Sequence, residues 1–163
     1  MNGAPGLYEL LAQLHIDFEY IEHPPAPTIE IAKKYWEGRD AQHCKNIFFR
    51  NHKGNRHYLV ILNCDYNMDI HDLEQRLKQG KLSFASETRL MNCLGVKPGS
   101  VTPFGFINDT EHAVYLFLDK TLQNAKRLSF HPCINTASLI IKKEDLIRFV
   151  EYCGNGYEWI ELY

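Results

Sequence analysis

A stiff, glycine-containing loop at residues 98–103 is the first segment whose composition suits chemistry. It reads PGSVTP, and the two flanking prolines restrict the backbone because their rings fix φ. Several main-chain N–H groups of such a loop could point at one spot and bind a carbonyl oxygen or the oxyanion formed from it. The same composition also suits a plain connecting turn. The candidate residues of this loop are Gly99, Ser100, Val101, Thr102 and Pro103.

Two further polar positions stand next to apolar runs. Lys45 and Asn46 lie at the entrance to Ile47-Phe48-Phe49, where strand alternation could turn the lysine towards a cleft. Lys45 could equally be an ordinary charge on an edge strand. His131 leads through Pro132 into the polar run Asn-Thr-Ala-Ser at residues 135–138, and it could act as a donor or base, or simply cap the turn.

Other catalytic and metal-binding patterns are absent from the sequence. It contains no G-x-S-x-G, G-x-x-x-x-G-K-[ST] or G-x-G-x-x-G motif, which argues against the common serine hydrolases, P-loop proteins and dinucleotide-binding proteins. The five cysteines are widely spaced and form no C-x-x-C pair, so we expect reduced thiols. The eight histidines form no H-x-x-x-H or H-E-x-x-H pattern. We therefore expect neither a metal nor a cofactor.

The periodicity of apolar residues predicts the elements that must position these groups. Leucines at 7, 10, 11 and 14 share one helical face, whereas residues 46–50 and 57–63 form apolar runs joined by a polar, glycine-containing turn. We predict helices over residues 7–14, 28–38, 70–80, 87–94 and 146–153, and strands over 18–21, 46–50, 57–63, 104–107, 113–118, 138–141 and 157–162. Residues 23–27, HPPAP, form a rigid extended turn.

The order of these elements predicts the fold class. Hairpins and helices alternate without a strict βαβ rhythm, which favours an α+β (mixed α/β) fold over a doubly wound sheet. We expect a mostly antiparallel or mixed central sheet flanked by helices, in a single domain over residues 1–163. No signal peptide or membrane-spanning run is present, and we expect a soluble, cytoplasmic protein.

Charge is distributed unevenly along the chain. The net charge of −2 argues against non-specific coating of nucleic acid, which requires many neutralised phosphates. Residues 33–56 nevertheless hold seven lysines and arginines against two acidic residues. This segment is either a solvated basic face or a surface that meets a polyanion.

Four segments taken in order resemble the YbaK/ProX family of aminoacyl-tRNA deacylases, also called prolyl-tRNA synthetase-associated domains. They are HP at 23–24 followed by TIE at 28–30, CKNIFF at 44–49, LGVKPGSVTPF at 94–104, and FHPCINT at 130–136. The resemblance covers almost the whole chain. It implies that Lys45 is needed for deacylation and that the loop from Gly99 to Pro103 holds the aminoacyl carbonyl.

The same resemblance implies a substrate pocket and a partner. The pocket for the aminoacyl group and the terminal adenosine would be lined by Asn46, His131, His23, Thr28 and Asn135. The partner would be the 3′ end of an aminoacyl-tRNA, with transient contact to prolyl-tRNA synthetase. The Lys45-Asn46 pair and the F-H-P-x-x-N-T run look closer to the branch acting on alanyl-tRNA(Pro) than to the branch acting on cysteinyl-tRNA(Pro). Pro25 and Pro27 depart from the pattern in the early turn.

Discrimination by size explains why such an enzyme is needed. A synthetase pocket built for proline cannot exclude alanine, because each missing methylene group costs only about 1–3 kcal/mol. A second pocket that admits alanine and rejects proline would correct the error by hydrolysis, with either water or a substrate hydroxyl making the first attack. A non-catalytic module that binds tRNA or a synthetase, and a hydrolase of other small esters, are the alternative functions.

Overall fold

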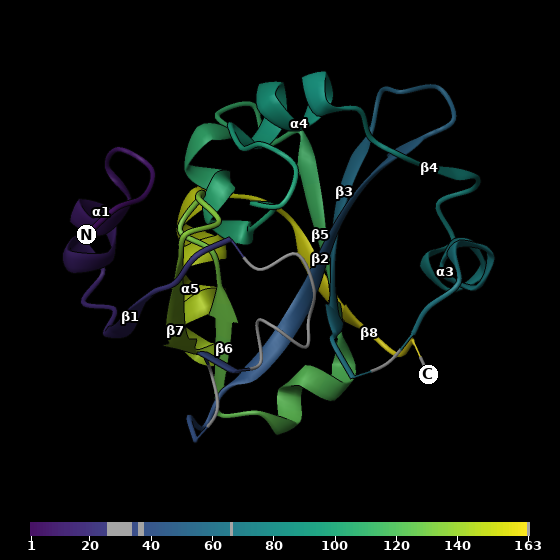
Figure 1. Ribbon diagram of the computed structural model, residues 1–163. Coiled ribbons are helices and arrows are strands. Elements are labelled where there is room, and N and C mark those ends of the chain that lie inside the picture. The colour runs from purple at the N-terminus through teal and green to yellow at the C-terminus, as the bar shows by residue number, and fades with distance from the viewer. Residues whose placement is uncertain (26–33, 36–37, 66, 163) are drawn as a thin grey trace.

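The computed structural model describes residues 1–25, 34–35, 38–65 and 67–162. In these residues eight strands form one sheet in the order β1-β7-β6-β2-β3-β5-β8, with β4 paired to β2 (Figure 1). The strands are β1 (Phe18–Glu22), β2 (Gln42–Asn51), β3 (His57–Asn63), β4 (Leu82–Phe84), β5 (Val114–Asp119), β6 (Arg127–Phe130), β7 (Ala137–Lys142) and β8 (Tyr157–Ile160). The helices are α1 (Leu7–Gln13), α3 (Ile70–Leu77), α4 (Glu87–Leu94), α5 (Lys143–Cys153) and the 3-10 helices η1 (Pro103–Asn108) and η2 (Lys120–Asn124).

The sheet is mixed, as expected. Strand β1 pairs antiparallel with β7, β7 with β6, and β2 with both β3 and β4. Parallel pairs join β2 to β6, β3 to β5 and β5 to β8. The structure therefore confirms a mixed central sheet flanked by helices.

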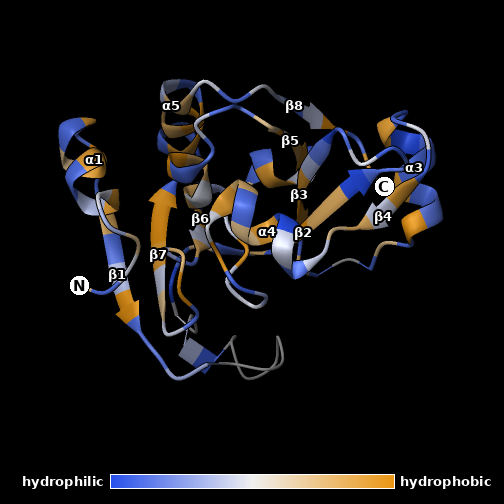
Figure 2. Cartoon of the chain, turned by 90° about the horizontal axis from the view of Figure 1, so that it is seen from above, coloured by the Kyte–Doolittle hydropathy of each residue, from blue (hydrophilic) through white to orange (hydrophobic). Residues whose placement is uncertain are grey.

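Apolar cores lie on both faces of the sheet. Leu59 and Ile61 of β3 pack in a large cluster that includes α1, α4, η1 and α5. The alternating residues Tyr58, Val60 and Leu62 belong to a second cluster that includes α3. Because β3 is buried on both faces, its sequence is a nearly continuous apolar run. Figure 2 shows hydrophobic colouring over most of β7, whose residues 137–141 are also buried.

The structure confirms two predicted features, the hairpin of β2 and β3 and the helix that precedes the glycine-containing loop. Strands β2 and β3 pair from Cys44 with Asn63 to Arg50 with His57. Helix α4 begins after Ser86, whose Oγ accepts a hydrogen bond from the Arg89 N–H, and it ends at Gly95 in the left-handed conformation.

The predicted strand at residues 104–107 is wrong, because this segment is the 3-10 helix η1. Pro103 occupies its first turn, and Thr102 Oγ1 accepts a hydrogen bond from Phe104 N–H. Gly105 packs so close to Leu94 that a Cβ would lie 2.8 Å from the leucine Cβ. Tertiary packing of Phe104 and Phe106, both buried, thus overrode an apolar run typical of a strand.

Other boundaries also differ from the predictions. Helix α3 ends at Leu77, where Lys78 rather than Gly80 adopts the first left-handed conformation. Strands β4 and β6 were not predicted, because both are short. The predicted helix at 28–38 lies largely outside the described residues. None of the described helices is both long enough and apolar enough to cross a lipid bilayer.

Candidate active site

A small pocket lies where strands β2 and β6 cease to pair. The two parallel strands are joined only through Gln42 with Leu128 and His43 with Ser129, although both continue beyond this point. Parting strands of a mixed sheet leave a crevice beyond their last shared hydrogen bonds. The crevice has a volume of about 160 Å³ and is lined by His43, Cys44, Asn46, Gly99, Val101, Ser129, Phe130, His131 and Ser138.

The end of α4 positions the loop that forms one wall. Gly95 has φ 66°, and a Cβ there would lie 2.6 Å from Nδ2 of Asn108. That amide nitrogen donates a hydrogen bond of 2.9 Å to the Leu94 carbonyl oxygen. Asn108 therefore closes the helix end, and only glycine leaves room for it. The chain then enters residues 96–102 in a defined direction.

Gly99 and Val101 of the loop line the pocket, and each carries a main-chain N–H group. For these two N–H groups the described residues offer no hydrogen-bond acceptor. The Ser100 N–H instead donates to the Lys97 carbonyl oxygen at 3.0 Å, so it is used within the turn. Thr102 is fully buried and, like Pro103, builds the start of η1 rather than the pocket wall.

His131 is held as a neutral ring. Its Nδ1 lies 2.8 Å from the Ala137 carbonyl oxygen, which can only accept, so Nδ1 carries the proton and Nε2 keeps a lone pair. Burial lowers the pKa of His131, and the neighbouring His23 lowers it further, against a raising effect of the Ala137 hydrogen bond. The ring is therefore available at neutral pH as a hydrogen-bond acceptor or a base.

His23 supports the pocket from behind. Its ring centroid lies 5.9 Å from that of His131, and its side chain is buried. Nδ1 of His23 donates to the Pro24 carbonyl oxygen at 2.9 Å, which leaves Nε2 to accept a hydrogen bond of 2.8 Å from Ser138 Oγ. His23 thus orients the pocket-lining Ser138. Sequence reasoning missed Ser138, although a serine opening the apolar run of β7 was a visible signal.

Asn46 brings an unpaired acceptor to the pocket. Its Oδ1 is buried, and among the described residues no donor reaches it. A buried polar atom without a partner costs about 1–3 kcal/mol, so this oxygen suits a donor supplied by a ligand.

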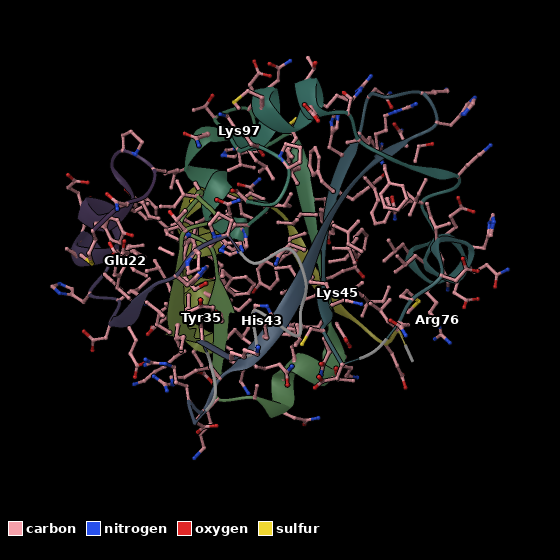
Figure 3. All side chains as sticks on the ribbon, viewed as in Figure 1. Glu22, Tyr35, His43, Lys45, Arg76 and Lys97 are labelled. Atoms are coloured by element: carbon pink, nitrogen blue, oxygen red, sulfur yellow. The ribbon has the colours of Figure 1, made fainter. Side chains whose placement is uncertain are left out.

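Lys45 does not line this pocket. Strand alternation places it on the face of β2 opposite Asn46, together with Ile47 and Phe49. Lys45 Nζ lies 3.5 Å from Oδ1 of Asn67, and Figure 3 labels the lysine on the central strand β2. Its charge therefore lies beside the pocket, on the other side of the strand.

The two remaining predicted residues differ in what can be said of them. Asn135 lies at the rim, since its Nδ2 is 3.8 Å from the position that a Cβ on Gly99 would take. Thr28 falls outside the described residues.

Cysteine chemistry does not fit the pocket. Burial raises the pKa of the Cys44 thiol well above its ordinary value, and the neighbouring Cys64 and Asp119 raise it further. The thiol is therefore protonated at neutral pH and is a poor nucleophile.

Among the residues described, no three His, Cys, Asp or Glu side chains gather as metal ligands would.

Comparison with known proteins identifies the family. Residues 23–149 match the model of the aminoacyl-tRNA editing domain, a stretch that contains every pocket-lining residue. The chain belongs to the aminoacyl-tRNA editing domain family. As an editing domain it is an aminoacyl-tRNA deacylase, an enzyme that hydrolyses the ester between amino acid and tRNA.

Individual relatives agree with this assignment. The editing domain is 36% identical over 162 residues to the prolyl-tRNA editing protein ProX of Acetoanaerobium sticklandii, and the match covers 99% of each chain. It is 33% identical to prolyl-tRNA synthetase associated domain-containing protein 1 of Danio rerio, over 89% of this chain and 79% of that protein. The crystal structure of a candidate trans-editing enzyme for prolyl tRNA synthetase shares the fold, with a TM-score of 0.71, 18% identity and coverage of 98% and 99%.

Proposed function

We propose that this editing domain acts in trans on Ala-tRNA(Pro) and hydrolyses its aminoacyl ester in the pocket between β2 and β6. The observation that carries the proposal is the lining of the pocket of about 160 Å³. Gly99 and Val101 line it with N–H groups that have no acceptor among the described residues, and Asn46 lines it with an Oδ1 that has no donor among them. The name of the Acetoanaerobium sticklandii relative, a prolyl-tRNA editing protein, supports tRNA(Pro) as the carrier.

The N–H groups of Gly99 and Val101 bind the ester carbonyl oxygen in this proposal. Negative charge develops on that oxygen when the carbonyl carbon is attacked, and fixed main-chain donors stabilise it without reorganisation. The left-handed conformation of Gly99, with φ 88°, sets the direction of this part of the loop.

Asn46 Oδ1 accepts a hydrogen bond from the α-ammonium group of the aminoacyl ester. The substrate then supplies the donor that the buried oxygen lacks in the free enzyme. Two fixed points, the carbonyl oxygen and the ammonium group, orient the ester for attack from one side.

Water attacks the carbonyl carbon, either directly or with assistance from the free hydroxyl group of the terminal ribose. The ester bond to the ribose oxygen breaks, the amino acid leaves with the oxygen of the water, and no covalent enzyme intermediate forms. The protonated Cys44 thiol is unsuited to a nucleophilic role, whereas the neutral His131 ring can accept a hydrogen bond from the attacking group. Lys45 holds the terminal phosphate or ribose in this proposal. The 3′ end therefore passes from the pocket across the edge of β2, which β6 no longer covers beyond His43, to the face that carries Lys45.

The pocket wall provides the size limit for the amino acid. Val101 and Phe130 are among its apolar lining residues, and in this proposal they limit the size of the side chain that enters. A side chain that is too large overlaps with a close-packed wall at a cost of about 1–3 kcal/mol, which favours alanine over proline. Cysteine, which is also small, is the closest competitor.

The partner in this reaction is the aminoacylated 3′ end of tRNA, with transient contact to prolyl-tRNA synthetase as the source of the mischarged substrate. Since charged tRNA is made and used in the cytoplasm, we place the activity there.

The decisive experiment compares three substrates. Ala-tRNA(Pro), Cys-tRNA(Pro) and Pro-tRNA(Pro), each labelled on the amino acid, are incubated with the wild type and with Lys45→Ala. Selective release of alanine that depends on Lys45 supports the proposal. Selective release of cysteine would identify Cys-tRNA(Pro) as the substrate in place of Ala-tRNA(Pro). Release from none of the three would favour a tRNA-binding module without catalysis.

A further inference from the structure

The segment that forms β2, its hairpin turn and β3 is exclusively basic in its charged residues. Residues 41–64 include Lys45, Arg50, Lys53 and Arg56 but no aspartate or glutamate, although the whole chain has a net charge of −2. Three of these cations fall within residues 50–57, which we call the basic hairpin. Its positive charge is therefore a local property that the overall composition conceals.

Hydrogen bonds fix the shape of the basic hairpin. Asn51 Oδ1 accepts from the N–H groups of both Asn55 and Arg56 at 3.1 Å, and the Gly54 N–H donates to the Asn51 carbonyl oxygen. From α4, Arg89 Nη1 donates to the Gly54 carbonyl oxygen at 2.8 Å. The turn thus presents its charges from a rigid backbone, which reduces the entropy cost of binding.

The charges at the tip are accessible and not neutralised. Lys53 and Arg56 are exposed, and the ion pairs found among the described residues include neither of them. Beside the tip lies a groove of about 510 Å³, whose lining includes Arg56, His57, Tyr115 and one carboxylate, Glu158, which accepts a hydrogen bond from Tyr115 Oη. A rigid cationic ridge next to a polar groove suits a sugar–phosphate backbone.

Strand β2 also sets the distance between this surface and the pocket. Asn46 lines the pocket, and Arg50 lies four residues further along the same strand, a separation of about 13 Å at the usual rise per residue. A few unpaired nucleotides at the 3′ end of a tRNA can cover this distance. The paired part of the acceptor stem then begins near the hairpin.

We propose that the basic hairpin binds the phosphate backbone of the tRNA acceptor stem while the aminoacylated 3′ end occupies the pocket. The inference rests on the proposed deacylase function for the position of the 3′ end. Phosphate contacts release condensed counterions, so binding through the hairpin depends on salt and not on which amino acid is attached.

The test is the double variant Lys53→Gln/Arg56→Gln, with Lys120→Gln/Lys126→Gln as the matched control. The control lysines are also exposed, but they lie in and just after η2 rather than in the hairpin. Two readouts are measured for each protein over a range of salt concentrations. One is the Kd for uncharged tRNA(Pro), from fluorescence anisotropy, and the other is the kcat and KM for hydrolysis of Ala-tRNA(Pro) and of alanine esterified to a CCA trinucleotide.

The hairpin variant is expected to bind tRNA about tenfold more weakly, as two lost surface charge contacts imply, and to reduce the slope of log Kd against log salt by about 2. Its KM for the full tRNA rises in parallel, whereas kcat and hydrolysis of the trinucleotide ester stay unchanged, and the control variant behaves as the wild type. An unchanged Kd and an unchanged salt slope would show that the hairpin is not the tRNA-binding surface. The same result is expected if the hairpin binds an acidic protein instead of tRNA. Weaker tRNA binding by the hairpin variant, combined with no hydrolysis of either substrate by the wild type, would support the surface and reject the proposed function.

Discussion

Lys45 and Asn46 are consecutive in the sequence but lie on opposite faces of β2. Asn46 lines the pocket and carries a buried Oδ1 that no donor of the described residues reaches, whereas Lys45 Nζ lies 3.5 Å from Oδ1 of Asn67 on the other face. Substitutions at the two positions should therefore affect the enzyme in different ways.

Asn46→Ala is expected to weaken substrate binding without loss of stability. The substitution removes a buried acceptor that has no partner among the described residues. Relief of that unpaired atom offsets the lost packing, so the free energy of unfolding should change by less than about 1 kcal/mol. The KM for the aminoacyl ester should rise, because the α-ammonium group loses its acceptor. Urea unfolding and steady-state hydrolysis check the two parts, with Asn46→Asp as the control that keeps an acceptor oxygen. A large loss of stability would mean that Asn46 has a structural role.

N-acetylation of the substrate tests the same contact from the other side. Acetyl-Ala-tRNA(Pro) has no ammonium group, and its amide adds bulk beside Asn46, so its hydrolysis should be at least tenfold slower, as expected when a buried polar group is left unpaired. Release of labelled alanine and acetylalanine at equal rates would show that the pocket does not bind the ammonium group.

Lys45→Ala is expected to abolish most of the turnover while the protein stays folded. The contact of Lys45 with Asn67 is long and exposed, and surface contacts of charged side chains contribute less than about 1 kcal/mol each to stability. Loss of a charge that positions the substrate should lower kcat/KM by about 100-fold or more. Lys45→Arg, which retains the charge, should recover part of the activity. Hydrolysis by Lys45→Ala at the wild-type rate would remove Lys45 from the mechanism.

Gly95→Ala should destabilise the protein more than Gly80→Ala. Both glycines have positive φ, 66° and 79°, so each substitution incurs backbone strain of about 1–2 kcal/mol. At Gly95 the new Cβ would also lie 2.6 Å from Asn108 Nδ2, whereas no atom lies within 4 Å of a Cβ at Gly80. Urea unfolding of the two variants isolates the effect of crowding. Equal losses would show that Asn108 moves aside without cost.

The stability should decrease as the pH falls below about 6.5. Burial lowers the pKa of both His131 and His57 from the ordinary value of 6.5, so the unfolded chain binds protons there that the folded chain does not. Stability falls with decreasing pH wherever the unfolded state binds more protons. Urea midpoints between pH 8 and pH 5 measure this trend, and His131→Gln should make it shallower. An identical slope in that variant would mean that His131 titrates normally.

The sequence by itself determined the family, the mixed fold and several local structures. The hairpin of β2 and β3 and the extent of α4 over residues 87–94 depend on residues close together in the chain, so local pattern predicts them. The apolar run at residues 104–107 has the same local appearance as a strand, yet it folds as η1 because Pro103 and the packing of Gly105 against Leu94 select a tight helix.

Only the tertiary structure decided which candidate residues meet. The pocket joins Asn46 of β2, the loop at Gly99 and Val101, and His131 after β6, which are far apart in the chain. It also shows that Ser138 lines the pocket with support from His23, and that Ser100 and Thr102 are used within their own turn and helix cap. Spacing along the chain cannot reveal this, because side-chain direction depends on strand register, and one residue of register exchanges the two faces of a strand.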